Sequence, residues 1–408
     1  MFFNPGDIQV NSVFLTSTRG SVDLTNLYQM ISIYESVLMP GVNAEIVVLE
    51  DKNLAGVLPL IGEETVTISF NTPSLDGPTY TFSIASLQDA QPTSNQKTKA
   101  YRLDCVSTEV NTHQSTLIQK SYNTNVSNMV QDIVKSFLKS SKHINTEQTM
   151  GIQQYIVSNK QPFDAILDLV KRAASSTNKS STFVFFENQD GFNFKTIEGM
   201  LQQAPVSTYT NNTITADSIY RVIFKNLIGY TIPEQFNTPG KIGQGAFASI
   251  TKTFDFKTMQ FVNNLTQPAN MNYAGSATNS AGFIAKFAQA AGRSMHLPVD
   301  SIQPDNFISS FIGNQKAFVA NLDQLKMVIR IFGDSTLKAG DMINVNIMQT
   351  DGSSGQSYLD PMLSGKWMIS DLRHVILPMD AKPQYTCICE LTSGGYGASN
   401  ATSGTPNV

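Results

Sequence analysis

Apolar and polar residues alternate along the N-terminal quarter of the chain. Val66, Ile68 and Phe70 are separated by hydroxyl-bearing residues, and the same spacing recurs in 80–84. Successive side chains of a strand point to opposite faces, so this spacing predicts strands with one apolar and one polar face. Such strands are typical of antiparallel sheets and barrels. Residues 1–110 are therefore expected to form a first antiparallel β-barrel.

The spacing of apolar residues changes between residues 111 and 205. In 125–138 they recur at intervals of three and four, which predicts an amphipathic helix. A second helix is expected to begin at Pro162, because proline suits the first helical position. The segment 182–195 predicts a β-hairpin, with the Asp190-Gly191 pair supplying the positive φ of its turn. Residues 111–205 are therefore expected to form an α/β insert domain.

Strand-like alternation returns in the C-terminal half, so that the fold class expected is α+β, dominated by β structure. Residues 206–230 and 320–392 are expected to form a second β-barrel, and 393–408, which is almost free of apolar residues, a flexible tail. Between the two parts, in 231–319, regular strands fade and a helical or irregular insert is expected, with the Ala-rich stretch 281–293 as its clearest element. The individual strands are expected at 218–224, 325–332, 342–348, 366–376 and 384–391.

The surface is expected to be polar but poor in charge. Charged residues make up 15% of the chain, against roughly 25% in an average soluble domain, and Asn, Gln, Ser and Thr take their place. Either the composition has simply drifted, or much of the surface is buried against other subunits, where unpaired charge is costly. The net charge of −4 argues against tight binding to a nucleic-acid backbone, which needs clustered Lys and Arg.

The cysteines and the N-terminus indicate a protein made and folded in a cytoplasm. Cys105, Cys387 and Cys389 are too few and too unevenly spaced for a disulfide framework, and we expect them to be small core residues. The N-terminal residues do not have the pattern of a signal peptide. No apolar run approaches the roughly 18 residues of a membrane span, so no membrane anchor is expected.

The residue types that carry enzyme chemistry do not fall into a recognisable pattern. The four histidines, His113, His143, His296 and His374, lack metal-ligand spacing. The segment 243–248 matches a dinucleotide-binding glycine pattern but does not follow a predicted strand. No catalytic, cofactor-binding or metal-binding residue is therefore assigned, no cofactor is expected, and the chain is not expected to be an enzyme.

A series of sequence motifs runs in a fixed order over most of residues 1–392, although each motif alone is loose. The motifs are Met39-Pro40-Gly41, the segment 58–64, the helix start 161–166, the hairpin 183–192, the segment 337–341 and the closing stretch from 364–369 to Arg373-His374. Their order resembles the baseplate hub subunits of contractile phage tails, relatives of the late control D proteins and of the N-terminal part of VgrG.

This resemblance implies a structural virion protein with two tail-tube-like barrels. Hub subunits of this kind form homotrimers, whose six barrels adapt a threefold central spike to the sixfold tail tube and leave a channel for DNA. The implied partners are the spike, the tail tube or tube-initiator protein and the baseplate wedge components, with no specific nucleic-acid binding. The implied location is the virion's tail baseplate, assembled in the host bacterial cytoplasm. Because the chain ends soon after the second barrel, the spike is expected to be a separate polypeptide.

Other functions remain open from the sequence. The chain could be a tail-tip hydrolase of cell wall or glycan, with carboxylates such as Glu63 or Glu109 as acid and base. Alternatively, it could be another structural component of the tail or baseplate. His374, near Trp367, is expected at the rim of the second barrel, where a half-buried imidazole would satisfy a backbone group.

Overall fold

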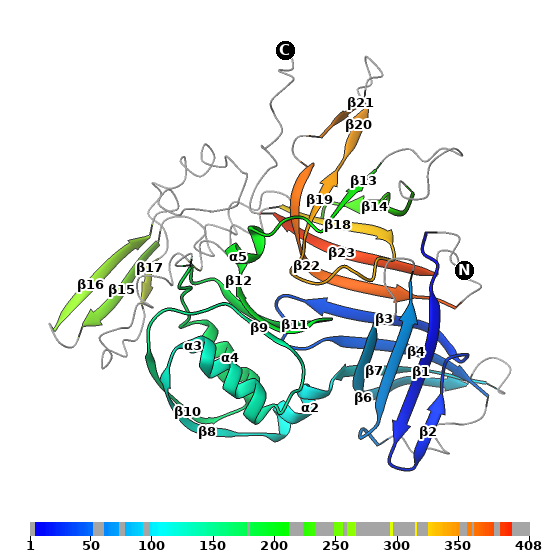
Figure 1. Ribbon diagram of the computed structural model, residues 1–408, viewed down its shortest axis with the longest axis horizontal. Helices are drawn as coiled ribbons and strands as arrows, with labels where there is room; N and C mark the ends of the chain where they lie inside the picture. The colour runs from blue at the N-terminus through cyan, green and yellow to red at the C-terminus, as the bar shows by residue number, and fades with distance from the viewer. Residues whose placement is uncertain are drawn as a thin grey trace.

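The computed structural model describes most of the two β units and of the insert between them. The residues described are 5–51, 61–72, 78–92, 98–177, 180–211, 223–233, 249–255, 259–266, 294–296, 315, 325–350, 357–360, 363–378 and 384–393. The fold is α+β and dominated by antiparallel strands, as the sequence predicts (Figure 1).

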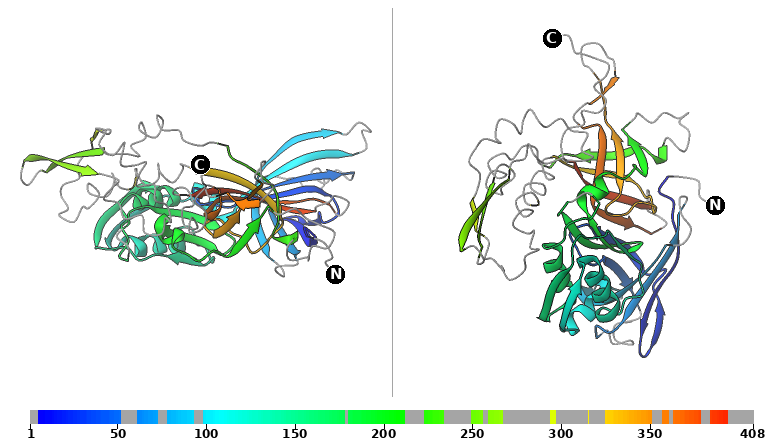
Figure 2. Two further views of the ribbon diagram at one scale, coloured as in Figure 1. Left: turned by 90° about the horizontal axis from the view of Figure 1, so that it is seen from above. Right: turned by 60° about the vertical axis from the view of Figure 1, so that its left-hand side comes forward.

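A curled sheet of 13 strands forms the body of the molecule (Figures 1 and 2). Its main path runs β2-β1-β5-β6-β7-β4-β3-β22-β23-β18-β14, and β19 and β13 branch from β22. The first unit supplies β1 (Gln9–Ser17), β2 (Gly20–Asp23), β3 (Tyr28–Ser36), β4 (Asn43–Glu50), β5 (Thr65–Asn71), β6 (Thr79–Pro92) and β7 (Lys99–Ser107). The second unit supplies β13 (Ser207–Thr210), β14 (Leu227–Thr231), β18 (Leu325–Phe332), β19 (Met342–Asn346), β22 (Gly365–Ile376) and β23 (Tyr385–Ser393).

The two β units are joined by pairing between β3 and β22. Asp371 lies opposite Ser36 and Ile376 lies opposite Ile31, with antiparallel register between them. The earlier part of β22 pairs with β19, and the opposite edge of β22 pairs with β23. The long strand β22 therefore belongs to the second unit and extends the sheet of the first.

The strand phases predicted from the sequence are confirmed. The side chains expected to face the core are at most 1% exposed: Val66, Ile68 and Phe70 in the first unit, and Ile343, Val345 and Ile347 in the second. Thr67 and Asn346, one position along, are half-buried on the opposite face. The two apolar faces belong to one continuous core, in which Phe70 of the first unit packs edge-on against Tyr385 of the second, with ring centroids 6.0 Å apart.

The insert between the β units has a core of its own. The two predicted helices and the predicted hairpin are present, but the first helix ends in a π-helical turn and the second ends at Val170. The elements are α2 (Thr108–Ser115), β8 (Ile118–Thr124), α3 (Val126–Asp132), η1 (Ile133–Phe137), β9 (Ile144–Thr146), β10 (Gln153–Lys160), α4 (Pro162–Val170), β11 (Phe183–Asn188), β12 (Gly191–Thr196) and α5 (Ile197–Leu201).

The hairpin turn needs its glycine for two reasons. Gly191 has a φ of +117°, a region that other residues rarely adopt. A Cβ at this position would lie 2.4 Å from the backbone oxygen of His143, which accepts a hydrogen bond from the N–H of Phe192. The glycine therefore lets β12 pack closely beside the chain that leads into β9.

The sequence interpretation of 231–319 missed three strands. Within the described part of this region, β15 (Ser249–Asp255) pairs antiparallel with β16 (Gln260–Thr266) and parallel with β17 (Ser294–His296). These strands are rich in Thr, Asn, Ser and Gln, so they lack the apolar alternation that reveals a strand in sequence. The predicted stretch 281–293 and the glycine-rich segment 243–248 lie outside the described residues.

Two further strand predictions need correction. The strand expected at 218–224 is wrong at Ile223 and Phe224, which are in a helical turn, and 218–222 lie outside the described residues; the described strand that follows is β14, which begins at Leu227. The strand expected over 342–348 ends at Asn346, and Met348 begins β20 (Met348–Thr350), which forms a hairpin with β21 (Ser357–Leu359). The expected tail 393–408 is described only at Ser393.

Candidate interaction surface

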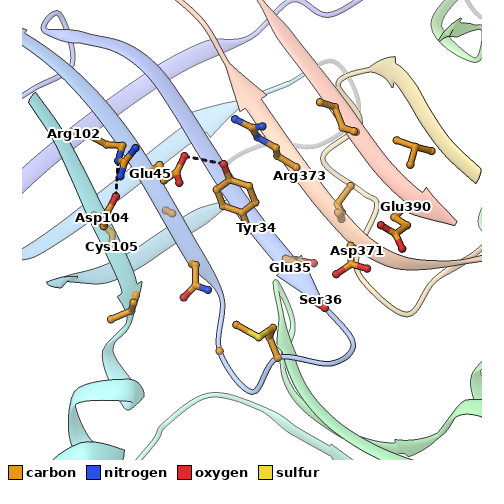
Figure 3. Close-up of a pocket in the computed structure, with 18 residues that line it drawn as sticks. Tyr34, Glu35, Ser36, Glu45, Arg102, Asp104, Cys105, Asp371, Arg373 and Glu390 are labelled. Carbon is orange, nitrogen blue, oxygen red and sulfur yellow. Dashed lines mark hydrogen bonds and ion pairs between the residues drawn. The ribbon is translucent and has the colours of Figure 1, made fainter. Parts of the chain in front are cut away.

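A groove of about 640 Å³ crosses the sheet at the joint between the two β units (Figure 3). Strands β7, β4 and β3 of the first unit and β22, β23 and β18 of the second contribute side chains to it. Most of the polar ones alternate with core residues, so they project from the face of the sheet that does not form the core. The groove is therefore a surface to which both units contribute.

Tyr34 and Arg373 lie at the centre of the groove. The hydroxyl of Tyr34 donates a hydrogen bond to Oε2 of Glu45 at 2.8 Å, and the Arg373 guanidinium lies over the tyrosine ring, 5.0 Å from its centroid (Figure 3). Nη2 of Arg373 also donates to Oγ of Ser32 at 3.1 Å. Burial and the bond to Glu45 raise the pKa of Tyr34, and Arg373 opposes this shift, so the phenol stays protonated at neutral pH.

Ion pairs occupy both ends of the groove. At the β7 end, Nε of Arg102 lies 2.9 Å from Oδ1 of Asp104. At the other end, Asp371 and Glu390 are cross-strand neighbours, and Lys326 pairs with Glu390 at 3.0 Å. The lining contains five carboxyl groups and two guanidinium groups: Glu35, Glu45, Asp104, Asp371 and Glu390 against Arg102 and Arg373. The groove lining therefore carries more acidic than basic side chains.

The structure gives the carboxylates considered for catalysis other roles. Glu63 is exposed in the turn before β5. Its neighbour Glu64 is buried and accepts hydrogen bonds from the N–H groups of Ile61 at 3.0 Å and Gly62 at 2.9 Å. Burial opposes ionisation, but these amides outweigh it and lower the pKa of Glu64. Glu64 therefore holds the turn as a carboxylate.

Glu109 is part of a buried polar cluster that ties the insert to the first β unit. Nζ of Lys142 lies 2.6 Å from Oε2 of Glu109 and 2.5 Å from Oε1 of Glu187, and Ser140 donates to Glu109 at 2.6 Å. Burial opposes ionisation of Glu109, but Lys142 and Ser140 lower its pKa to about 2. A general acid needs a pKa near the working pH, so Glu109 is unsuited to that role.

His374 is placed differently from the sequence expectation, which was wrong about its burial and its partner. The side chain is 1% exposed, and its Nδ1 lies 2.8 Å from Oη of Tyr385 and 3.3 Å from Sγ of Cys387, so its partners are side chains and not a backbone group. Burial lowers the pKa of His374 to about 4. The imidazole is therefore a neutral core group, because β22 runs through the middle of the sheet and not along a rim.

The cysteines are core residues, as predicted, and the structure describes no metal cluster. Cys105, Cys387 and Cys389 are all buried free thiols. In the part of the chain that the structure describes, no group of three or more His, Cys, Asp or Glu side chains is placed to hold a metal ion. Within the same segments, no helix combines the length and apolar character needed to cross a bilayer.

The sequence analysis did not single out the groove. Tyr34, Glu45 and Arg373 are separated by up to hundreds of positions in the chain, and only the pairing of β3 with β22 brings them together. One local signal was present: Asp371 and Arg373 flank Leu372, and Glu45 lies between Ala44 and Ile46, a spacing that marks strands with charged residues on one face.

Comparisons with known proteins point to phage tails. No protein-family model matches the chain. A probable baseplate hub protein of Vibrio phage KVP40 is 22% identical over 277 residues, which cover 62% of this chain and 63% of that protein. The chain is thus similar to a baseplate hub protein over part of its length. The alignment thus leaves more than a third of this relative's length unmatched.

The solved structures agree on the fold. A tail protein from Neisseria meningitidis MC58 superposes with a TM-score of 0.59 at 10% identity, over 95% of this chain and 98% of that one. The 43 kDa tail protein of prophage MuSo2 from Shewanella oneidensis gives 0.59 at 8% identity, over 95% and 99%. The resemblance to baseplate hubs expected from the sequence is therefore confirmed, and the comparisons support a structural component of a phage tail or baseplate.

Proposed function

We propose that this chain is the central hub subunit of a contractile phage baseplate. Three copies would form a ring in which six β units adapt a threefold spike to the sixfold tail tube. The observation that carries the proposal is the continuous sheet: each chain holds two curled β units joined edge to edge through β3 and β22. Three such chains supply six similar β units, which is the number that a sixfold tube requires.

The proposed partners are the spike, the tail tube or its initiator protein, and the wedge components of the baseplate. The hub would act in the virion, after assembly in the bacterial cytoplasm, and would have no catalytic role. The geometry supports this, because Glu64 and Glu109 are carboxylates stabilised in their ionised form and Glu63 lies in an exposed turn. This arrangement does not favour the glycan-hydrolase alternative.

Light scattering of the purified chain, alone and mixed with its spike protein, tests the hub proposal. We expect a threefold particle in at least one of the two samples. A stable 44.6 kDa monomer in both would refute the proposal. A monomer that also releases fragments from peptidoglycan would favour the hydrolase instead.

The groove face is our candidate for the wall of the DNA channel. It crosses both β units, as a channel wall must, and even without the buried, neutral Glu35 its four other carboxyl groups outnumber its two guanidinium groups. Negative charge repels the DNA backbone and lets duplex DNA pass without sticking. In the assembled ring, replacing Glu45 and Asp371 with Lys should create salt-sensitive retention of duplex DNA, whereas replacing both with neutral Gln and Asn should not. Equal retention by the wild type would contradict this role.

A further inference from the structure

The first β unit, the second β unit and the insert all meet at the peptide groups of one residue, Ala339. Its N–H donates to Oε2 of Glu35 on β3 at 3.0 Å, and its carbonyl accepts a hydrogen bond from Nδ2 of Asn188 on β11 at 3.2 Å. Glu35 is 1% exposed. A change at Glu35 therefore acts where all three parts of the molecule are in contact.

Apolar side chains from the same three parts pack around this point. The turn at Gly340 has a φ of +92°, and a Cβ there would lie 3.1 Å from both Sδ of Met200 and Cζ of Phe186. The packing is therefore tight enough that a displaced turn would disturb its neighbours. The cluster consists of Val37, Phe186, Ile197, Met200, Leu201, Ala339, Met342 and Met368.

Two buried oxygen atoms at this joint have no hydrogen-bond partner among the described residues. They are Oε1 of Glu35 and Oε1 of Gln189, which is in the turn after β11. An ionised carboxylate can only accept hydrogen bonds, and so can the amide oxygen. A protonated Glu35 instead carries an O–H donor. The unpartnered oxygen therefore disfavours ionisation of Glu35, because a buried unpaired anion is costly.

The charges around Glu35 also favour its neutral form. The negative charges of Asp341 and Glu187 act on Glu35 and disfavour its ionisation. The nearby lysines pair with other carboxylates: Lys142 with Glu187, and Lys338 with Asp190. Among the ion pairs of the described residues, none involves Glu35.

Burial therefore raises the pKa of Glu35 to about 8, although the N–H groups of Ala339 and Gln189 oppose the shift. Burial also raises the pKa of Asp341 to about 6, while Lys195 and Lys338 favour its ionised form. On the core side, burial, and to a smaller extent the charge of Glu35, raise the pKa values of Tyr80 and Cys387, so both are neutral.

We propose that Glu35 is a proton-dependent lock, which holds the insert against both β units when it is neutral and loosens the joint when it ionises. Ionisation would leave a buried anion beside two other carboxyl groups, and separation of the joint would relieve this by admitting water. The lock does not depend on the hub proposal, since every contact that it uses lies within one chain.

Hydrogen exchange of the full chain tests the lock. We would compare peptides containing Ala339 and 183–196 at about pH 6 and about pH 9, correcting each for its intrinsic exchange rate. In the wild type, protection of both should fall roughly a hundredfold, because Glu35 ionises near 4.5 in the open joint and near 8 in the closed one, so that each pH unit between 6 and 8 favours opening about tenfold. Glu35→Gln, a neutral mimic of the protonated acid, should keep its protection at both values. Glu63→Gln, the same change in an exposed turn, should behave as wild type.

Two outcomes would overturn the proposal. One is an equal loss of protection in Glu35→Gln and in the wild type. The other, which needs no variant, is a wild-type joint whose protection is unchanged between the two pH values. Should Glu35→Gln fail to fold, the wild-type measurement still decides, with peptides of the β8–β10 pair as the internal reference.

Discussion

Tyr34 and Arg373 lie directly opposite each other on β3 and β22, and the guanidinium covers the tyrosine ring at 5.0 Å from the centroid. Their positions in the chain are more than three hundred residues apart, yet they form one cross-strand pair. The contact links the two β units on the face of the sheet that lies opposite the shared core.

This pair should contribute a measurable coupling energy. A double-mutant cycle of Tyr34→Leu and Arg373→Met, followed by urea denaturation, should give about 0.5–1 kcal/mol, the range for cation–π pairs near a surface. Tyr34→Phe keeps the ring but loses the bond to Glu45, so it should preserve most of the coupling. A coupling energy of zero would mean that the contact between Tyr34 and Arg373 does not stabilise the folded protein.

Lysine substitutions along two strands test the sheet faces directly. Ile68→Lys and Val345→Lys bury an unpaired charge in the core, which should cost several kcal/mol, enough to unfold a domain of ordinary stability. Thr67→Lys and Asn346→Lys, on the opposite face, should fold, although they could still block assembly. Soluble yield and circular dichroism of the four variants would reveal the difference. Equal folding of all four would show that the assigned strand faces are wrong.

Lys142 should be one of the most sensitive surface-accessible positions in the insert. Lys142→Met leaves Glu109 and Glu187 buried without their cation, and removing one member of a buried ion pair costs about 3–5 kcal/mol. Lys171→Met removes an exposed i,i+3 partner of Asp168 and should cost at most about 0.5 kcal/mol. Thermal denaturation of both variants provides the comparison, and similar melting temperatures would contradict the prediction.

The pH dependence of the Lys142→Met defect follows from the same contacts. In the wild type, the lowered pKa of Glu109, about 2 against 4.5, contributes stability above pH 4.5 that is lost as the pH falls towards 2. In the variant this contribution is gone, and protonation removes the unpaired charges. The difference in unfolding free energy between wild type and variant should therefore shrink as the pH falls below 4.5. A constant difference would exclude the ion pairs as its cause.

His374 should make the protein sensitive to mild acid. Its pKa is lowered from 6.5 to about 4, so below pH 6.5 the unfolded chain binds a proton that the folded chain does not. The contribution of His374 to stability should therefore fall as the pH decreases from 6.5 to about 4, and it opposes the contribution of Glu35 above pH 4.5. His374→Gln should remove this slope, and it should cost about 1 kcal/mol at pH 7 if Gln keeps the bond to Tyr385. Urea midpoints measured across this range provide the test, and an unchanged slope in the variant would contradict the assignment.

Local periodicity predicted the elements whose residues alternate cleanly. The strand around Ile68, the helix beginning at Pro162 and the turn at Gly191 are examples, because each depends on a few adjacent residues. The pairing of β3 with β22 depends on residues far apart in the chain, and no local pattern records it. The polar strand β16 was missed because its sequence carries little apolar alternation.

The candidate site was less predictable than the fold. The charge of Glu109 could be read from the sequence, but its buried partner Lys142 could not, so an ion-paired residue looked like a candidate acid. For His374 the error lay in the position of its strand: β22 has neighbours on both edges, which places the imidazole in the core. Glu35 showed no sequence signal, since its raised pKa comes from burial among parts of the chain that are far apart in the sequence.

The sharing of β22 between the two units also sets how the molecule responds to mechanical load. A force that slides one unit past the other along β3 and β22 acts on all rungs of that ladder together, from Asp371 to Ile376. Bonds loaded side by side must break at the same time, so the two units should behave as one stiff plate under shear. In the proposed hub, bending of the subunit would therefore occur away from this ladder, for example where the insert packs on the β units.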